Sequence, residues 1–169
     1  MWLKLLIVTT VFFLLGLFQS SFLPHVSIMG IIPNLVFILF FVLVFFEKST
    51  AYHEGIFYTV IAGLVTDIFS SSYFGPGILS LLVTYSAMKI LFYLLEERRG
   101  KYLFFYFLIV FLVSFILYEI LFSLFVIIPH GTFTLRQNII VEESFNMAIA
   151  LLVFYFYPGK NPTQLTLFK

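Results

Sequence analysis

Four polar residues lie inside stretches that are otherwise apolar, and their types could do chemistry. Asp67, Lys89 and Glu119 are ionisable, and Asn146 carries an amide that both donates and accepts hydrogen bonds. Ionisable groups are costly inside a bilayer, so such residues mark functional or structural sites. Similar expected depths predict that Glu119 pairs with Lys89, with Asn146 or with both. The alternative is that Lys89 reaches the cytoplasmic surface and Glu119 is protonated.

Asp67 precedes a tight turn, Gly75-Pro76-Gly77. As a functional group, Asp67 would serve a ligand or proton site. As a structural group, it would accept hydrogen bonds from Ser70 to Ser72, or from the free amides at the start of the next helix, whose N-terminus has positive dipole character. The structural interpretation is favoured, because proline suits a helix start, the glycines permit positive φ, and a tight turn must be held in place.

Other chemistry has little support in the sequence. The three histidines fall in three different loops, and His53-Glu54 lacks the second histidine of a zinc-protease motif. The chain has no cysteine, and its net charge of +1 gives no reason to expect nucleic-acid binding. Glu142 and Glu143 suit the first turn of a helix. The sequence therefore predicts no catalytic, metal or cofactor site.

The elements that position these residues are apolar helices. The composition is 62% hydrophobic and 10% charged, whereas soluble domains carry about 25% charged residues. A helix needs about 20 apolar residues to cross a bilayer. We predict an all-α integral membrane protein, a single domain with short loops and six transmembrane helices at residues 5–23, 28–46, 55–69, 77–95, 102–128 and 139–157. The first could be mistaken for a signal peptide, but no small-x-small cleavage site follows it.

The third predicted helix carries small or polar residues at a spacing of four, which places them along one face: Gly55, Thr59, Gly63 and Asp67. Small residues on a stripe allow a second helix to approach closely. We therefore expect this face, and Asp67 with it, to contact protein rather than lipid. The 25 phenylalanines of the chain are expected to face lipid or a partner protein.

The distribution of Lys and Arg sets the orientation. With a cytoplasmic N-terminus, one residue, Arg136, lies in an outer loop, and seven lie inside: Lys4, Lys48, Arg98, Arg99, Lys101, Lys160 and Lys169. We expect both termini in the cytoplasm. The run from Glu96 to Lys101 acts as a topology signal and could also face anionic lipid or a cytoplasmic partner.

The order of motifs from residue 33 to residue 80 resembles the MreD family of rod shape-determining proteins. The second predicted helix opens with Pro33-Asn34-Leu35, the third contains Ala62-Gly63-Leu64 followed by Asp67, and Gly75 and Leu79 come after it. In this resemblance Pro33, Asn34, Gly63, Asp67 and Gly75 match the family pattern, and they are candidates for architecture rather than chemistry. The long fifth helix, with Glu119, shows no matching motif.

The resemblance implies a non-enzymatic protein of the bacterial inner membrane that serves the cell-elongation machinery and lateral peptidoglycan synthesis. The implied partners are a single-span MreC-like protein, the RodA polymerase with its class B penicillin-binding partner, and MreB filaments. MreD-like proteins share their general architecture with the substrate-binding components of energy-coupling factor transporters. The alternative is such a component, with Asp67, Glu119 and Asn146 around a ligand. The first helix lacks the Ala-x-x-x-Ala pair with which these components commonly dock, which favours the scaffold.

Overall fold

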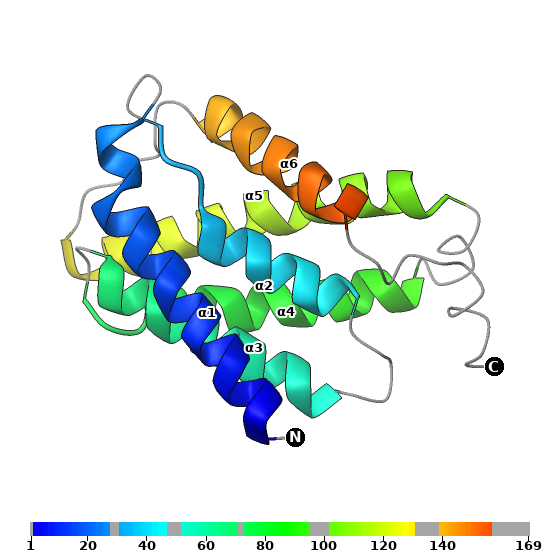
Figure 1. Ribbon diagram of the computed structural model, residues 1–169, viewed down its shortest axis with the longest axis horizontal. Helices are drawn as coiled ribbons and strands as arrows, with labels where there is room; N and C mark the ends of the chain where they lie inside the picture. Colours follow the sequence, from blue (N-terminus) through cyan, green and yellow to red (C-terminus); the bar gives the residue numbers. More distant parts are fainter. Residues whose placement is uncertain are drawn as a thin grey trace.

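The computed structural model describes residues 2–27, 31–46, 52–70, 73–94, 102–130 and 139–156, and these ranges contain helices and no strand. Figure 1 shows the arrangement of the elements, which are α1 (Trp2–Ser21), the short 3-10 helix η1 (Leu23–His25), α2 (Leu35–Phe45), α3 (Tyr52–Phe69), α4 (Pro76–Leu94), α5 (Leu103–His130) and α6 (Ile139–Phe156). The prediction of an all-helical protein is confirmed.

Five of the helices agree with the predicted spans to within three residues at each end. Three segments are long and apolar enough to cross a membrane, namely Leu3–His25, Pro76–Leu94 and Leu103–Val126. By the same measure α2, with 11 residues, is a shorter apolar helix. These three helices indicate a membrane protein, and the other three predicted spans stay a prediction.

The second helix begins later than predicted. We expected a helix from residue 28 with Pro33 in its first turns, but α2 begins at Leu35 and Pro33 precedes it. Proline has no amide hydrogen and disfavours helical geometry at the residue before it, Ile32. Asn34 then caps the helix, and its side-chain oxygen accepts the amide hydrogen of Phe37 at 3.0 Å. Residues 28–30 lie outside the described part of the chain.

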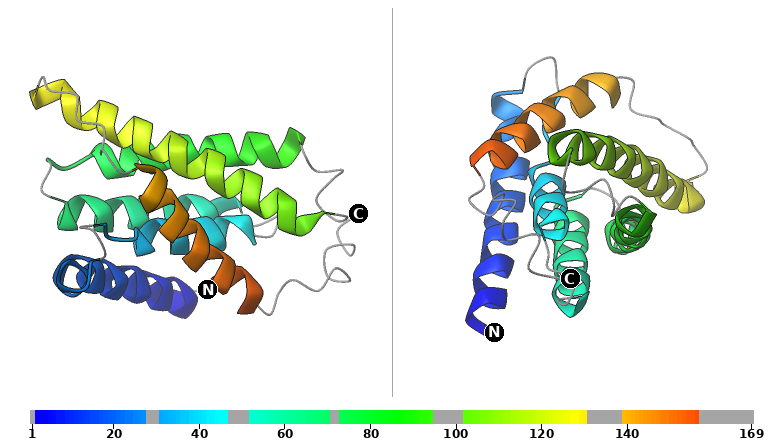
Figure 2. Two further views of the ribbon diagram at one scale, coloured as in Figure 1. Left: turned by 90° about the horizontal axis from the view of Figure 1, so that it is seen from above. Right: turned by 90° about the vertical axis from the view of Figure 1, so that its right-hand side faces the viewer.

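α2 lies in the middle of the helices and packs against α1, α3, α5 and α6 (Figure 2). A helix that is apolar on every side is typical of a buried position. Only three of the eleven residues of α2 are not buried; the buried ones are Val36, Phe37, Ile38, Phe40, Phe41, Val42, Val44 and Phe45. The shortest α-helix is therefore the core of the fold.

Phenylalanine rings join α2 to α5. Phe37, Phe41 and Phe45 are spaced by four residues on α2, as are Phe107, Phe111 and Phe115 on α5. Their rings meet edge to face, with centroids 5.3 Å apart for Phe37 and Phe115, 4.8 Å for Phe41 and Phe111, and 5.0 Å for Phe45 and Phe107. The expectation that phenylalanine faces lipid or a partner is wrong for these six, because the two stripes face each other.

Consecutive α-helices run in opposite directions, so the molecule has two ends (Figures 1 and 2). We call one the Asp67 end; it holds the ends of α1, α3 and α5 and the starts of α2, α4 and α6. The other is the Lys4 end, with the starts of α1, α3 and α5 and the ends of α2, α4 and α6. The polar residues of interest divide between these two ends.

Candidate functional site

Asp67 holds the start of α4. Its side chain is buried, with 4% exposure. Oδ1 accepts the amide hydrogen of Gly77 at 2.6 Å, and Oδ2 accepts those of Gly75 and Ile78 at 3.0 and 3.3 Å. The first amides of a helix have no partner within the helix, and a carboxylate there also faces the positive end of the helix dipole. The predicted hydrogen bonds from the start of the fourth helix are confirmed; Ser71 and Ser72 lie outside the described residues.

The glycines around Asp67 allow α3 and α4 to approach closely. A Cβ atom on Gly63 would lie 2.5 Å from the Cα of Ile78, and one on Gly77 would lie 2.7 Å from Asp67 Oδ1. Gly75 has φ +126°, so the predicted positive φ occurs in this turn. The predicted face of α3 is buried as expected, with Gly55, Thr59, Gly63 and Asp67 all in contact with protein. Both carboxylate oxygens of Asp67 are therefore occupied by hydrogen bonds within the junction of α3 and α4.

A second junction forms at the start of α2. The amide hydrogen of Asn34 is donated to Asn146 Oδ1 on α6 at 2.7 Å. The amide of Val36 donates to Gln19 Oε1 near the end of α1 at 3.4 Å. Side chains from α1 and α6 thus satisfy amides at the start of α2, which follow Pro33 and have no partner within the helix. Asn146 is part of the architecture of this end.

Glu119 was predicted to pair with Lys89, with Asn146 or with both. Glu119 on α5 is buried, with 7% exposure. Lys89 lies in the half of α4 nearer the Lys4 end, where its Nζ is 5.2 Å from the centre of the Tyr85 ring and 5.9 Å from that of Phe92. Oδ1 of Asn146 accepts the backbone amide hydrogen of Asn34. The pairing of Glu119 with Lys89 or Asn146 stays a prediction.

Two consecutive acidic residues, Glu142 and Glu143, lie where α6 begins. Glu142 lies in the first turn of α6 as predicted, but its side chain is buried with 4% exposure. Both carboxylate oxygens of Glu143 are enclosed and have no hydrogen-bond partner, and the same holds for Nδ2 of Asn146. Glu142 and Glu143 were predicted to cap the helix, and the enclosure of the Glu143 carboxylate was not predicted.

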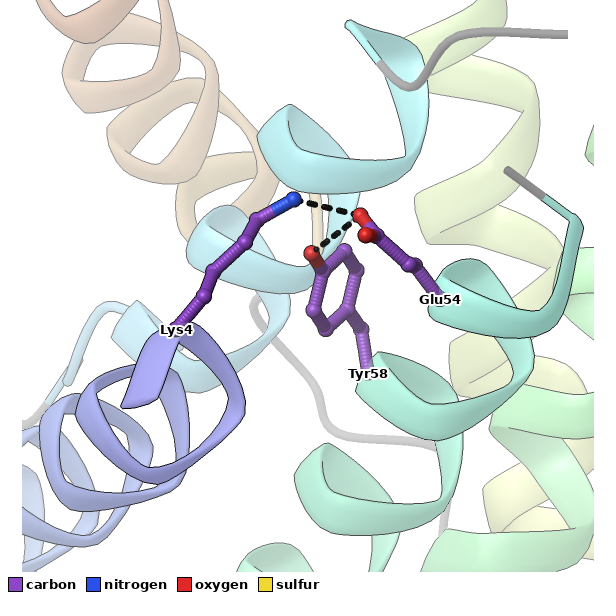
Figure 3. Close-up of polar contacts among 3 residues, drawn as sticks. All are labelled: Lys4, Glu54 and Tyr58. Atoms are coloured by element: carbon purple, nitrogen blue, oxygen red, sulfur yellow. Dashed lines mark hydrogen bonds and ion pairs between the residues drawn. The ribbon is translucent and has the colours of Figure 1, made fainter. Parts of the chain in front are cut away.

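A cluster of three polar residues at the Lys4 end was not predicted from the sequence; it consists of Lys4, Glu54 and Tyr58 (Figure 3). Lys4 on α1 forms an ion pair with Glu54 Oε2 on α3, and the hydroxyl of Tyr58 donates to the same oxygen at 3.0 Å. Glu54 precedes the third predicted span, and the hydrogen bond from Lys4 holds the pKa of its carboxyl below the usual value, against the opposing effect of burial. The sequence held a signal for this pair, since Lys4 and Glu54 each immediately precede a predicted span on the same predicted side of the membrane.

The fold and these junctions indicate the class of protein. It is an all-helical membrane protein in which polar side chains join different helices through hydrogen bonds and an ion pair. The described residues contain no group of three or more His, Cys, Asp or Glu side chains that could hold a metal ion. Comparison with known protein families, with curated proteins and with solved structures gives no match. The likeness to MreD and to the substrate-binding components of transporters therefore stays a prediction from the residues.

Proposed function

We propose that the six helices cross a bacterial cytoplasmic membrane, with both termini in the cytoplasm. The alternating helix directions support an even number of crossings, and the excess of Lys and Arg supports a cytoplasmic Lys4 end. Tyrosines favour the membrane–water boundary, and Tyr93, Tyr102 and Tyr155 are all more than half exposed at the Lys4 end.

α2 fits this arrangement although it spans only about 16 Å at 1.5 Å per residue. Non-helical backbone at membrane depth is tolerated where protein covers it and satisfies its amides. Ile31 is buried, and Asn34 reaches Asn146, so the segment before α2 is covered by other parts of the chain.

The function we propose is a non-enzymatic scaffold of the cell-elongation machinery, of the MreD type, which binds other transmembrane proteins. The observation that carries this proposal is the location of the five residues that match the MreD pattern, which all lie at junctions between helices or at a helix start. Gly63, Asp67 and Gly75 build the junction of α3 and α4, and Pro33 and Asn34 set the start of α2. All five serve architecture, which is what a protein that acts by shape and packing requires.

The proposed partners are a single-span MreC-like protein, RodA with its class B penicillin-binding partner, and MreB filaments. The second candidate is a substrate-binding subunit of a small-molecule transporter. The enclosed and unpartnered groups of Glu143 and Asn146 favour it, while the engagement of Asp67 with three backbone amides does not.

A pull-down tests the two functions. The tagged protein is extracted from its native membrane in mild detergent, and bound proteins are identified by mass spectrometry, with an unrelated six-helix protein carrying the same tag as control. We expect enrichment of cell-wall elongation proteins. Enrichment of transporter ATPases, or none beyond the control, would contradict the scaffold function.

A further inference from the structure

The inner face of α6 changes character along its length. Four of its residues at a spacing of four are buried, in chain order Glu142, Asn146, Ala150 and Phe154. The two near the Lys4 end are apolar and pack in the core, where the ring of Phe154 lies 4.6 Å from that of Phe107. The two near the Asp67 end are polar. An apolar bundle gains nothing from polar groups at this depth unless they meet partners.

The orientation of the Asn146 amide is set by its neighbour. Asn34 donates its backbone hydrogen to Oδ1 at 2.7 Å, and a reversed amide would place two donors against each other. The other atom of the side-chain amide is therefore the NH₂ nitrogen, Nδ2. It has no hydrogen-bond partner although Asn146 is 0% exposed. The structure leaves a buried donor that requires an acceptor.

Glu143 has acceptor atoms that lack a donor, whereas Asn146 has a donor that lacks an acceptor. It precedes Asn146 by three residues, so the two side chains share a face of α6. Both of its carboxylate oxygens are enclosed without a donor. The adjacent residue in the chain, Glu142, is buried as well, and carboxylates attract a nearby cation. A donor and two acceptors thus stand unpartnered on one buried face.

We propose that Glu143 and Asn146 bind an ammonium group that carries an oxygen atom a few bonds away, as in ethanolamine. The N–H groups of the ammonium donate to the Glu143 carboxylate, and the oxygen accepts from Asn146 Nδ2. A metal ion fits less well, because the described residues offer no set of three ligands. A quaternary ammonium also fits poorly, because it has no hydrogen to donate.

Two sources can supply this chemistry, a phosphatidylethanolamine headgroup or a free amino alcohol. Glu143 lies four residues after the first residue of α6, or about 6 Å along the helix. If α6 crosses the membrane as proposed above, this depth is within reach of a lipid headgroup. The site does not depend on the scaffold function, since a lipid or a small ligand can occupy a scaffold and a transport subunit alike.

Binding to the purified full-length protein tests the proposal. Native mass spectrometry and thermal unfolding in detergent are followed with ethanolamine, ethylamine and choline, and then with phosphatidylethanolamine, phosphatidylcholine and phosphatidylglycerol. Ethanolamine or phosphatidylethanolamine should bind most tightly. Ethylamine lacks the oxygen acceptor and choline lacks the N–H donors, so both should bind more weakly. Binding of the free compound points to a metabolite, and binding of the lipid alone points to a headgroup.

The matched variants are Glu143→Gln and Glu54→Gln, which remove one carboxylate at each end of the bundle. Loss of a charge-assisted hydrogen bond is worth about tenfold to a hundredfold in affinity, so Glu143→Gln should weaken binding by that factor and Glu54→Gln should leave it unchanged. Circular dichroism confirms that both variants are folded. Absence of binding to the wild type, equal binding of choline and ethanolamine, or unchanged affinity of folded Glu143→Gln would overturn the proposal.

Discussion

At the scale of single residues, Asp67 shows how one carboxylate supplies hydrogen-bond acceptors that the backbone amides of a turn would otherwise lack. Three backbone amides at the start of α4 point at it, and the side chain is buried. Because hydrogen bonds to a charged group are stronger than those between neutral groups, this contact dominates the junction.

We expect Asp67→Asn to lower the free energy of unfolding by about 1–3 kcal/mol, because it removes the charge and places an NH₂ group against backbone donors. Asp67→Ala should cost more, since it leaves all three amides without an acceptor. Reversible unfolding in mixed detergent micelles measures both, with Ser86→Ala at an exposed position of α4 as control. Wild-type stability of Asp67→Asn would contradict the role assigned to the carboxylate.

Two glycines provide a matched comparison of close approach. A Cβ atom on Gly63 would meet the backbone of Ile78, whereas one on Gly16 of α1 would meet the side chains of Val65 and Phe69. Side chains can shift and backbone cannot shift as cheaply, so Gly63→Ala should destabilise the protein more than Gly16→Ala. Thermal unfolding of the two variants, followed by circular dichroism, tests this order. Equal melting temperatures would show that α3 and α4 separate easily.

At the scale of elements, α2 is a short apolar helix whose position depends on its neighbours. Its start is held by side chains from α1 and α6, and its length is lined by rings of α5. Edge-to-face ring pairs contribute about 0.5–1.5 kcal/mol each beyond the area that they bury. α2 thus organises the packing of the longer helices.

Phe41→Ala should cost about 3–5 kcal/mol, because it removes a fully buried ring and leaves a cavity. Phe105→Ala provides the control, since Phe105 on α5 is 62% exposed. Unfolding in detergent should separate the two variants clearly. If both cost the same, the ring contacts between α2 and α5 are not the core of the fold.

The Lys4–Glu54 pair joins α1 to α3 at a partly exposed position, with side-chain exposures of 57% and 28%. A double-mutant cycle with Lys4→Met and Glu54→Gln should give a coupling of about 0.2–1 kcal/mol. The pKa of Glu54 is lowered in the folded state, so the contribution is present above the unfolded pKa of about 4.3 and disappears as the pH falls through the lowered value. A coupling that does not decline on acidification would contradict this assignment.

At the scale of the whole molecule, the alternating helices place the two ends on opposite sides of the proposed membrane. The chain has no cysteine, so single cysteines can be introduced without background. Val26→Cys lies near the Asp67 end and Tyr102→Cys at the Lys4 end, and both positions are more than half exposed. In intact spheroplasts a membrane-impermeant maleimide should label the first, and it should label the second only after permeabilisation. Labelling of both before permeabilisation would contradict the proposed topology.

The sequence by itself determined the helical class, five helices and the role of Asp67, because apolar length, proline and glycine punctuation and a carboxylate before a helix start are local signals. Only the tertiary structure decided that α2 begins at Leu35 and is the core, that its phenylalanines face α5, and that the carboxylate of Glu143 is enclosed. The physical reason is that an apolar helix face has the same pattern of residues in the sequence whether lipid or protein covers it. Contacts between helices far apart in the chain depend on their rotation and crossing, which no local pattern encodes.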